Sequence, residues 1–387
     1  MELKIGLIGC GGMMGAHVKN GYAPLWEAGY RDFEIIACCD VVEQSAANMS
    51  TDIAEWQGTQ PRVYTSYEDM LDAEPDMAAL DIVVTHSSHH SVAIHCIESG
   101  RHVMLEKPLA MTMRAGRLIL DAVEAHGKVF SIAENYRRSV EHRAFNWLIE
   151  SGRIGNLRQL YWVGCRDRQW HWGWRDELDK AGGGWTLDGG IHSADLFRYH
   201  IGPVKSLTAL SRQYDNIRYK DREKLSDPVE ATIEDTTMAL LEFENGVTGV
   251  WVESIVCPGQ GLGVQHLYGD EGSLDLRKGV QLRGQDEPTS MDELKDEFMN
   301  QLSQEQSEAF FPRGIRNPLA HEVHEFVEAC LRGGGIETDG SEGFKAQAIC
   351  MAVYESAALG MQPVAMTDIE SLEIEKYQRP LNEGMGI

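Results

Sequence analysis

The chain has 387 residues, a length that favours two domains and that allows a large apolar core without disulfide bonds. It carries 35 Lys and Arg residues against 60 Asp and Glu residues, and the net charge of −25 argues against nucleic acid and anionic membranes as partners. No C-x-x-C pair, no signal peptide and no run of about eighteen apolar residues is visible, so we expect a cytoplasmic protein without membrane spans.

Strands and helices are predicted to alternate through the first third of the chain. Short apolar runs have the character of buried strands, and the segments between them have helical periodicity. Such alternation is typical of βαβ units, whose right-handed crossovers build a doubly wound parallel sheet. In chain order the predicted elements are strand 3–8, helix 15–27, strand 33–39, helix 45–56, a helix after the capping Ser66, strand 79–84, helix 91–99, strand 102–105, helix 113–126 and strand 129–133.

The pattern changes after this first third. Beyond one more helix, 140–151, short strands dominate, and a turn signal at 244–246 favours an antiparallel sheet. We therefore expect an α/β protein with a doubly wound domain over 1–134 and a second α/β domain over 135–387. A polar stretch at 283–308 is predicted to be a surface excursion. The other predicted elements are strands 157–165, 204–210, 236–243, 247–254 and 265–268, and helices 321–331 and 341–359.

A glycine-rich loop lies between the first predicted strand and the first predicted helix, which is the context of a dinucleotide-binding loop. Gly9 and Gly11 fit the first two positions of G-x-G-x-x-G, whereas Met14 occupies the third and Gly15 follows one residue late. An ordinary tight turn is the alternative for this loop taken alone. The residues expected to approach the cofactor are Gly9, Gly11, Gly12, Met13 and Met14.

Asp40 ends the second predicted strand and strengthens the nucleotide interpretation. An acid at this position accepts hydrogen bonds from the ribose hydroxyls of an adenosine. No Arg or Lys occurs between Asp40 and Ser50 to bind a 2′-phosphate, so NAD is favoured over NADP as the cofactor. A solvated strand end is the alternative for Asp40.

Two further segments follow predicted strands, at the edge where open α/β sheets bind ligands. Thr85 to His90 contains three histidines that lie too close in sequence to converge on one ion, so no metal is expected and a place along the cofactor is favoured over a surface role. Lys107 lies in Glu106-Lys107-Pro108, and the proline biases it toward an extended geometry that fixes the direction of its side chain. An ordinary surface lysine is the alternative.

A glycine-rich stretch of the second half, 182–196, contains Asp188 and His192. Four residues apart on one helix, the two side chains lie on one face within hydrogen-bonding reach, and an aspartate so placed selects the tautomer of the histidine. Such a histidine accepts the proton of a hydroxyl while hydride leaves the same carbon. A capping Asp with a core His is the alternative, although five glycines near the helix start favour a site that another group approaches closely.

With these residues in place, the chain resembles the Gfo/Idh/MocA family of NAD(P)-dependent oxidoreductases from Lys4 to about Val364. The most specific features are the tripeptide at 106–108, the stretch 182–192 and their order after the glycine loop. The resemblance implies a Rossmann domain followed by an α/β domain with a large open, mainly antiparallel sheet. In this family that sheet usually forms the interface of a homodimer or homotetramer.

The resemblance also implies roles for single residues. Lys107 polarises the reacting oxygen, His192 acts as acid and base, and Asp188 orients the histidine or contacts the sugar. The replacement of the family's Pro and Asn by His86 and Ser87 is a departure on the nicotinamide side. Contacts with the nicotinamide end of the cofactor are implied for Thr85, His90, Glu106 and Asn135.

The substrates that the resemblance implies are sugars, cyclitols and their derivatives. A polar and aromatic cluster before the glycine run suits such a substrate, because aromatic rings stack on pyranose C–H faces while Arg, Asp and Gln bind hydroxyls. A packed loop at an oligomer interface is the alternative. The residues expected to contact the substrate are Arg168, Trp170, His171 and Trp172.

The leading hypothesis is an NAD(H)-dependent oxidoreductase that transfers hydride between nicotinamide and a carbinol carbon of a sugar, cyclitol or sugar derivative. A redox-neutral alternative cleaves a glycoside through a transient keto-sugar and uses the same lysine and histidine. A NAD-binding regulator without catalysis is disfavoured, because Lys107, Asp188 and His192 are all present.

Overall fold

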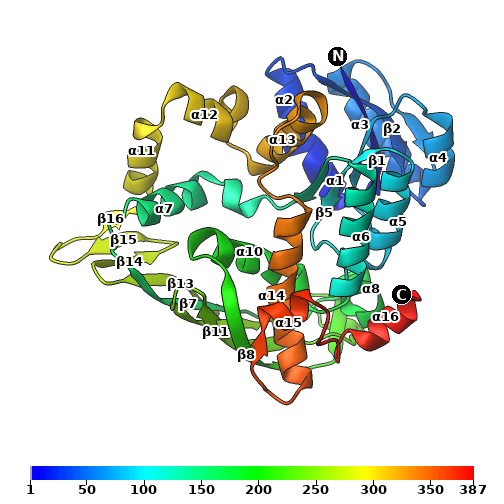
Figure 1. Ribbon diagram of the computed structural model, residues 1–387. Helices are drawn as coiled ribbons and strands as arrows, with labels where there is room; N and C mark the ends of the chain where they lie inside the picture. The colour runs from blue at the N-terminus through cyan, green and yellow to red at the C-terminus, as the bar shows by residue number, and fades with distance from the viewer. Residues whose placement is uncertain (1) are drawn as a thin grey trace. The chain divides into compact units, whose positions relative to one another are not determined.

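The computed structural model describes residues 2–387, which form two compact units (Figure 1). The first unit contains the chain up to Ala110, Gly116–Ser139 and Leu302–Gly343. The second unit contains Met111–Ala115, Val140–Gln301 and the chain from Phe344 onward.

This division differs from the two consecutive domains expected from the sequence, because residues 302–343 return to the first unit. Helix α13 (Pro318–Arg332) places Val323, Phe326 and Val327 in the buried core that also holds the apolar residues of β1 and β2. A helix with an apolar stripe has to bury it against another element, and here that element is the N-terminal sheet.

Six parallel strands form the sheet of the first unit, in the order β3-β2-β1-β4-β5-β6. Strands β4 and β6 are buried along their whole length, as parallel strands covered on both faces should be. This sheet confirms the expected doubly wound class. The strands are β1 (Leu3–Ile8), β2 (Phe33–Cys39), β3 (Arg62–Tyr64), β4 (Ala79–Ile82), β5 (His102–Glu106) and β6 (Phe130–Ala133).

The helices between the strands of the first unit follow the predicted alternation. Strand 33–39 and helix 113–126 are confirmed to the residue. The helix predicted at 15–27 begins earlier and contains a π-helical turn, and the helix predicted at 91–99 begins five residues earlier. The helices are α1 (Gly12–His17), the π-turn η1 (Val18–Tyr22), α2 (Ala23–Glu27), α3 (Glu43–Gln57), α4 (Tyr67–Ala73), α5 (His86–Glu98), α6 (Met113–His126), the 3-10 turn η2 (Tyr136–Arg138), α12 (Gln304–Phe310), the 3-10 turn η4 (Pro312–Gly314) and α13.

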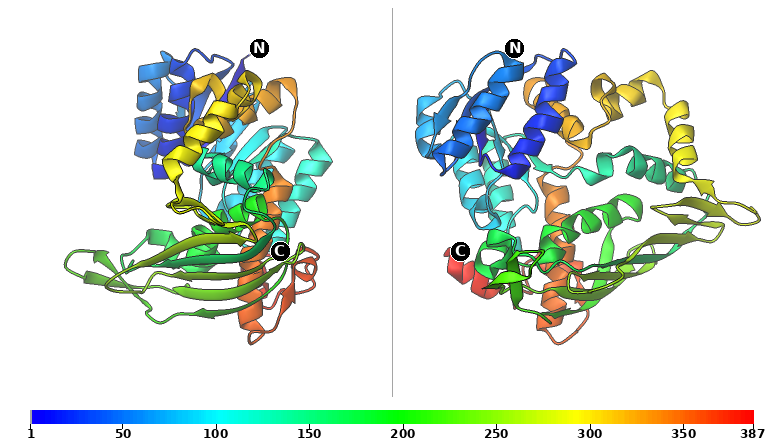
Figure 2. Two further views of the ribbon diagram at one scale, coloured as in Figure 1. Left: turned by 90° about the vertical axis from the view of Figure 1, so that its left-hand side faces the viewer. Right: turned by 180° about the vertical axis from the view of Figure 1, so that it is seen from behind.

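Nine strands form the large sheet of the second unit, in the order β16-β15-β14-β13-β7-β12-β11-β8-β17. Only β7 and β12 pair in parallel, so the expected open, mainly antiparallel sheet is confirmed (Figure 2). A separate hairpin joins β9 to β10. The strands are β7 (Leu157–Cys165), β8 (Val204–Arg212), β9 (Ile217–Asp221), β10 (Ser226–Glu230), β11 (Thr236–Phe243), β12 (Thr248–Ser254), β13 (Leu262–Gly269), β14 (Gly272–Asp275), β15 (Gly279–Leu282), β16 (Thr289–Ser290) and β17 (Val364–Ala365).

The polar stretch at 283–308 is not the irregular excursion expected, because it contains β16, α11 and part of α12. In α11, Leu294 and Phe298 are the buried residues, and Phe298 packs on the Trp147 ring at 6.1 Å. Two buried apolar side chains in a charged segment do not produce an apolar stripe clear enough to reveal the helix. Across residues 2–387 no helix combines the length and apolar character that a membrane span needs. The remaining helices are α7 (Val140–Glu150), the 3-10 turn η3 (Gly173–Asp176), α8 (Leu178–Ala181), α9 (Trp185–Asp188), α10 (Gly190–His200), α11 (Met291–Gln301), α14 (Gly340–Ala358), α15 (Met366–Glu370) and α16 (Arg379–Met385).

Gly9 turns the chain from β1 into the loop before α1. Its φ is +85°, and a Cβ atom added to it would lie 2.0 Å from the carbonyl oxygen of Val83. Gly58, which follows α3, has a φ of +86° but nothing within 4 Å of the same position. Both positions therefore have a left-handed backbone, but only at Gly9 would a side chain also collide with a neighbouring carbonyl group.

Gly9→Ala is expected to lower the free energy of unfolding by about 3 kcal/mol or more, because left-handed strain and a backbone clash add. Gly58→Ala should cost only about 1 kcal/mol, since strain alone acts there. Urea unfolding of the two variants beside the wild type measures both values. Equal losses in the two variants would contradict the role assigned to Val83.

Candidate active site

The glycine loop opens at the carboxyl end of β1. The N–H of Gly9 donates to the Cys39 carbonyl at 2.8 Å, and Gly11 is the N-cap of α1. Gly11 and Gly12 are exposed, and a Cβ atom added to either would touch nothing within 4 Å. Backbone N–H groups of a helix N-terminus at an open place suit a pyrophosphate. Met14 directs its fully buried side chain into the core, so only its backbone belongs to the loop.

Asp40 lies at the end of β2, as predicted, and joins this strand to the glycine loop. Its Oδ2 accepts the N–H of Cys10 at 2.7 Å, and its Oδ1 accepts the N–H of Val42 at 2.8 Å. Each carboxylate oxygen has a second lone pair that remains for the hydroxyls of a ribose. Asp40 therefore fits the adenosine end of the cofactor.

The histidine-rich segment begins α5 instead of preceding a helix, and Thr85 is its N-cap. His86 and His89 are buried, whereas His90 is half-buried. Among the three histidines, His90 is therefore the one accessible enough to contact a cofactor. The Nδ1 of His89 lies 2.8 Å from the Pro108 carbonyl oxygen, and burial lowers the pKa of His89. A neutral His89 donating from Nδ1 fastens α5 to the residue that follows Lys107.

Lys107 directly follows β5 and is half-buried. The Lys107–Pro108 peptide bond is cis, and Pro108 is buried beside it. Asn135 follows β6 in the same way and is also half-buried. Because all six strands are parallel, the glycine loop, Asp40, Thr85, Lys107 and Asn135 share the carboxyl edge of one sheet.

A buried cluster of titratable side chains lies beneath this edge. His17 of α1 contacts the Asp81 Oδ2 through Nδ1 at 2.9 Å and the Glu106 Oε1 through Nε2 at 3.4 Å. The Tyr22 hydroxyl donates to the same Asp81 oxygen at 3.1 Å, and the Glu322 Oε1 lies 3.9 Å from the His17 Nε2. We call these five residues the His17 cluster. Of its members, only Glu106 had been singled out from the sequence.

The pKa values within the His17 cluster are displaced by burial and by the neighbouring charges. Burial favours a neutral His17, but Asp81 and the other carboxyl groups outweigh it and raise its pKa well above the ordinary value. Burial raises the pKa of Glu322 to about 8, against the opposing effect of His17 and Arg138. At neutral pH the cluster therefore holds a charged imidazolium and a protonated Glu322.

In the second unit, Asp188 and His192 lie on two short consecutive helices and not on the single helix expected. Asp188 ends α9, His192 belongs to α10, and Gly189 joins them. Asp188 is buried and accepts a hydrogen bond from the Arg175 Nε at 3.2 Å, whereas His192 is half-buried. A Cβ atom on Gly189 would lie 2.4 Å from the Trp185 ring, which explains the glycine between the helices.

The glycine run before α9, residues 182–184, packs closely against other residues of the second unit. A Cβ atom on Gly183 would lie 2.5 Å from the Tyr354 hydroxyl, and one on Gly184 would lie 2.4 Å from the Glu234 carbonyl oxygen. The half-buried Glu234 carboxyl group accepts the Gly184 N–H at 2.6 Å and the Tyr354 hydroxyl at 2.9 Å, and desolvation of the carboxyl group raises its pKa to about 7. No sequence pattern singled out Glu234, which lies beside Asp235 in the loop between β10 and β11.

The residues expected to contact the substrate are strongly engaged with each other. The His171 Nδ1 lies 2.8 Å from the Asp176 Oδ2, and the Trp172 ring stacks on the Trp185 ring with 5.6 Å between centroids. The Arg168 guanidinium lies 3.3 Å above the centroid of the Trp172 ring. The aromatic surface near Asp188 is thus partly covered by guanidinium groups.

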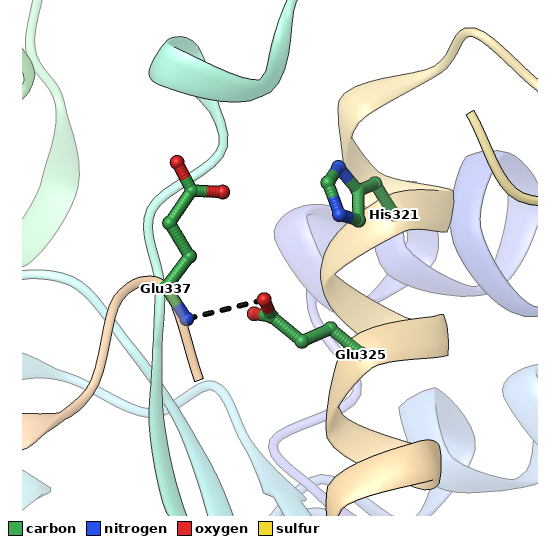
Figure 3. Close-up of side chains that lie close together, drawn as sticks. All are labelled: His321, Glu325 and Glu337. Carbon is green, nitrogen blue, oxygen red and sulfur yellow. Dashed lines mark hydrogen bonds between the residues drawn. The ribbon is translucent and has the colours of Figure 1, made fainter. Parts of the chain in front are cut away.

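A group of possible metal ligands lies in the first unit, where His321, Glu325 and Glu337 come within 4.8 Å of one another (Figure 3). The buried Arg138 guanidinium lies 2.7 Å from the Glu325 Oε2 and 3.5 Å from the Glu337 Oε2. The Glu337 N–H also donates to the Glu325 Oε1. Because Arg138 already supplies the positive charge between the two glutamates, this group is accounted for without a metal ion.

A doubly wound parallel sheet with a glycine-rich turn after β1 and an aspartate after β2 defines the NAD-binding Rossmann class. Residues 3–134 match the family described as an oxidoreductase family with an NAD-binding Rossmann fold, and residues 142–275 match the GFO/IDH/MocA C-terminal domain. The chain belongs to the Gfo/Idh/MocA family of oxidoreductases, with NAD as its cofactor, which confirms the resemblance seen in the sequence.

Individual relatives cover between 65% and 92% of this chain. A levoglucosan dehydrogenase from Pseudarthrobacter phenanthrenivorans is 24% identical over 402 residues, covering 92% of this chain and 96% of that enzyme. A D-glucoside 3-dehydrogenase from Escherichia coli is 26% identical over 260 residues, covering 65% of this chain and 70% of that enzyme. A solved structure of levoglucosan dehydrogenase in complex with NADH has a TM-score of 0.76 at 22% identity, covering 95% of this chain and 99% of that one, and shows the same fold.

The His17 cluster predicts a pH-dependent stability. Because the pKa of Glu322 rises from the ordinary 4.5 to about 8 on folding, the folded chain keeps a proton that the unfolded chain releases. This contribution to stability is complete below pH 4.5 and is lost as the pH rises to about 8. Glu322→Gln remains neutral at every pH, so its Tm relative to wild type should rise by several degrees between about pH 5 and pH 8.

The matched control is Glu98→Gln, which removes an exposed carboxyl group at the end of α5 in the same unit. Its Tm should follow the wild-type curve at each pH. The charged or titratable neighbours of Glu322 are present in all three proteins; they are His17, Arg138, Asp81, Glu106 and Tyr22. Parallel curves for wild type and Glu322→Gln would show that Glu322 does not hold a proton near neutrality.

Proposed function

We propose that the protein is an NAD-dependent dehydrogenase that acts on a carbinol carbon of a sugar, cyclitol or sugar derivative. The observation that carries this proposal is the position of Lys107, half-buried at the carboxyl end of β5 in an NAD-binding sheet. The named relatives support the substrate class, since both are dehydrogenases of sugars or glucosides. Because the relatives are dehydrogenases, the redox-neutral alternative is not favoured.

The cofactor is expected along the carboxyl edge of the parallel sheet. Gly9, Gly11, Gly12, Met13 and the backbone of Met14 would line the pyrophosphate, with Asp40 on the adenosine ribose. When bound, NAD supplies the hydride acceptor or donor at nicotinamide C4. The residues proposed for the nicotinamide end are Thr85, His90, Glu106 and Asn135.

The chemistry of the substrate is assigned to three side chains. The Lys107 ammonium would donate to the reacting oxygen and stabilise the negative charge that develops when the hydroxyl loses its proton. His192 would take that proton, and return it in the reverse direction. Asp188, itself held by Arg175, would orient the imidazole or contact a neighbouring hydroxyl.

Lys107→Ala tests this assignment. Loss of the group that polarises the reacting oxygen should lower kcat by about 10²-fold to 10⁴-fold. The Kd for NADH should stay within about threefold of wild type, because the proposed pyrophosphate and ribose contacts lie elsewhere. NADH formation with a panel of sugars and cyclitols measures the first value, and NADH fluorescence titration measures the second.

The control is Lys128→Ala, another half-buried lysine of the first unit, placed just before β6. It should retain wild-type kcat. Full turnover in Lys107→Ala would remove the lysine from the mechanism. An inactive wild type that binds NADH would instead favour the regulatory interpretation.

We further propose that the large sheet forms a homodimer or homotetramer. Neighbouring strands of this sheet expose apolar side chains, including Leu240 at 63%, Met238 at 43% and Tyr161 at 38% relative exposure. Leu240 pairs with Val250 and Val250 with Tyr161 in adjacent strands, so these side chains lie in one row on one face. An exposed apolar patch of this kind suits a protein interface.

Leu240→Lys should shift the wild-type oligomer toward monomer at micromolar concentration, because a charge would replace the most exposed apolar side chain of the row. Sedimentation velocity measures the distribution. Leu225→Lys is the control, since Leu225 is an exposed leucine outside the large sheet and should leave the distribution unchanged. A monomeric wild type would rule out this interface.

A further inference from the structure

Arg168 holds a guanidinium group without a polar partner. It follows β7, and its guanidinium carbon lies 3.3 Å from the Trp172 ring centroid, 4.5 Å from that of Trp185 and 5.1 Å from that of Trp170. Its Nε is buried, and no hydrogen bond or ion pair joins the guanidinium to another residue within 2–387. Stacking on indole rings explains where the group lies but leaves its N–H donors unused.

Three more arginines surround Arg168, and carboxylates compensate only part of their charge. Arg166 pairs with Glu253 at 3.2 Å. Arg175 pairs with Asp188 at 3.2 Å. Arg222 lies 3.9 Å above the Trp170 ring and has no ion pair within the described residues. Arg168 and Arg222 are therefore the two of these four guanidiniums that lack a carboxylate partner within residues 2–387.

The neighbouring guanidinium groups repel the charge of Arg168. Burial lowers the pKa of Arg168 to about 10, and the neighbouring Arg166, Arg222 and Arg175 add to this effect while Asp188 opposes it. A guanidinium under this repulsion gains more from an anion than an isolated one would. Its planar fork of donors matches the two oxygens of a carboxylate or phosphate.

We propose that Arg168 binds an anionic oxygen group, a carboxylate or a phosphate, on the substrate, so that the enzyme acts on acidic sugars in preference to neutral ones. This inference rests on the proposed function, because it makes Asp188 part of the site. Arg175 links Arg168 to Asp188: it contacts Asp188, and its guanidinium carbon also lies 5.9 Å from the Trp172 ring on which Arg168 is stacked. The anionic group would thus be held a short distance from the reacting carbon.

The test compares glucose, galactose and mannose with their uronates and their 6-phosphates, in the wild type, in Arg168→Gln and in Arg168→Lys. NADH formation gives kcat/KM. Tryptophan fluorescence in the presence of NAD also detects the binding of sugars that are not oxidised, since the Arg168 site is built from indole rings. We expect Arg168→Gln to lower kcat/KM for the preferred acid by about 10-fold to 100-fold. Neutral sugars should change by less than about threefold, and Arg168→Lys, which keeps the charge without the fork, should fall between.

Arg158→Gln is the control, because Arg158 is an exposed arginine of β7, the strand that precedes Arg168, and it pairs with Asp270 at 3.6 Å. Preference for uronates identifies a carboxylate, and preference for 6-phosphates identifies a phosphate. Equal activity on neutral and acidic sugars, unchanged in Arg168→Gln, would overturn the inference and leave the dehydrogenase standing. Fluorescence changes with acids that Arg168→Gln abolishes, without any turnover, would keep the anion site and overturn the dehydrogenase. No response to any acid in either measurement would overturn the inference.

Discussion

The first unit depends on one directional constraint, which is that its six strands all run the same way. A parallel sheet buries both faces beneath helices, so only its edges stay open to a ligand. The glycine loop, Asp40, Thr85, Lys107 and Asn135 each follow a different strand, and the common direction brings them to one edge. A dinucleotide bound along this edge, as proposed, would reach different strands with its adenosine and nicotinamide ends.

The His17 cluster connects this edge to the interior. Glu106 belongs to the cluster and immediately precedes Lys107, so the charges that hold Glu106 also fix the strand end that carries the lysine. A buried charge cluster contributes little net stability, yet removal of one member leaves the others uncompensated. The position of Lys107 is therefore set by a balance of charges as well as by apolar packing.

The sequence predicted those features whose signal is local. Strand 33–39, helix 113–126 and the Ser66 cap, whose hydroxyl accepts the Asp69 N–H, are each encoded within one turn or one alternating run. The glycine loop and Asp40 were found for the same reason. Features that join distant segments were not found.

Glu322 shows why. It lies 305 positions after His17 in the sequence, and only the return of 302–343 to the first unit brings the two together. Glu234 likewise supports the glycine run through partners 50 and 120 positions away. A local hydrophobic pattern or a short motif does not indicate such distant pairs. The amphipathic helix α11 was missed because most of its residues are charged or polar. Local patterns therefore predicted the scaffold and the candidate site residues, and long-range burial supplied the groups that pack around them.

Charged side chains have two different roles in the second unit. Glu234 and Glu253 each accept several N–H or O–H groups and act as internal anchors, with pKa values that burial raises. Arg168 has the opposite character, since its buried Nε meets no acceptor among residues 2–387. The negative charge of the whole chain would repel an anionic sugar at long range, but salt screens charges beyond about 8 Å at physiological ionic strength. An acidic substrate would then be selected at contact distance, so the guanidinium group should act on the dissociation rate far more than on the rate of encounter.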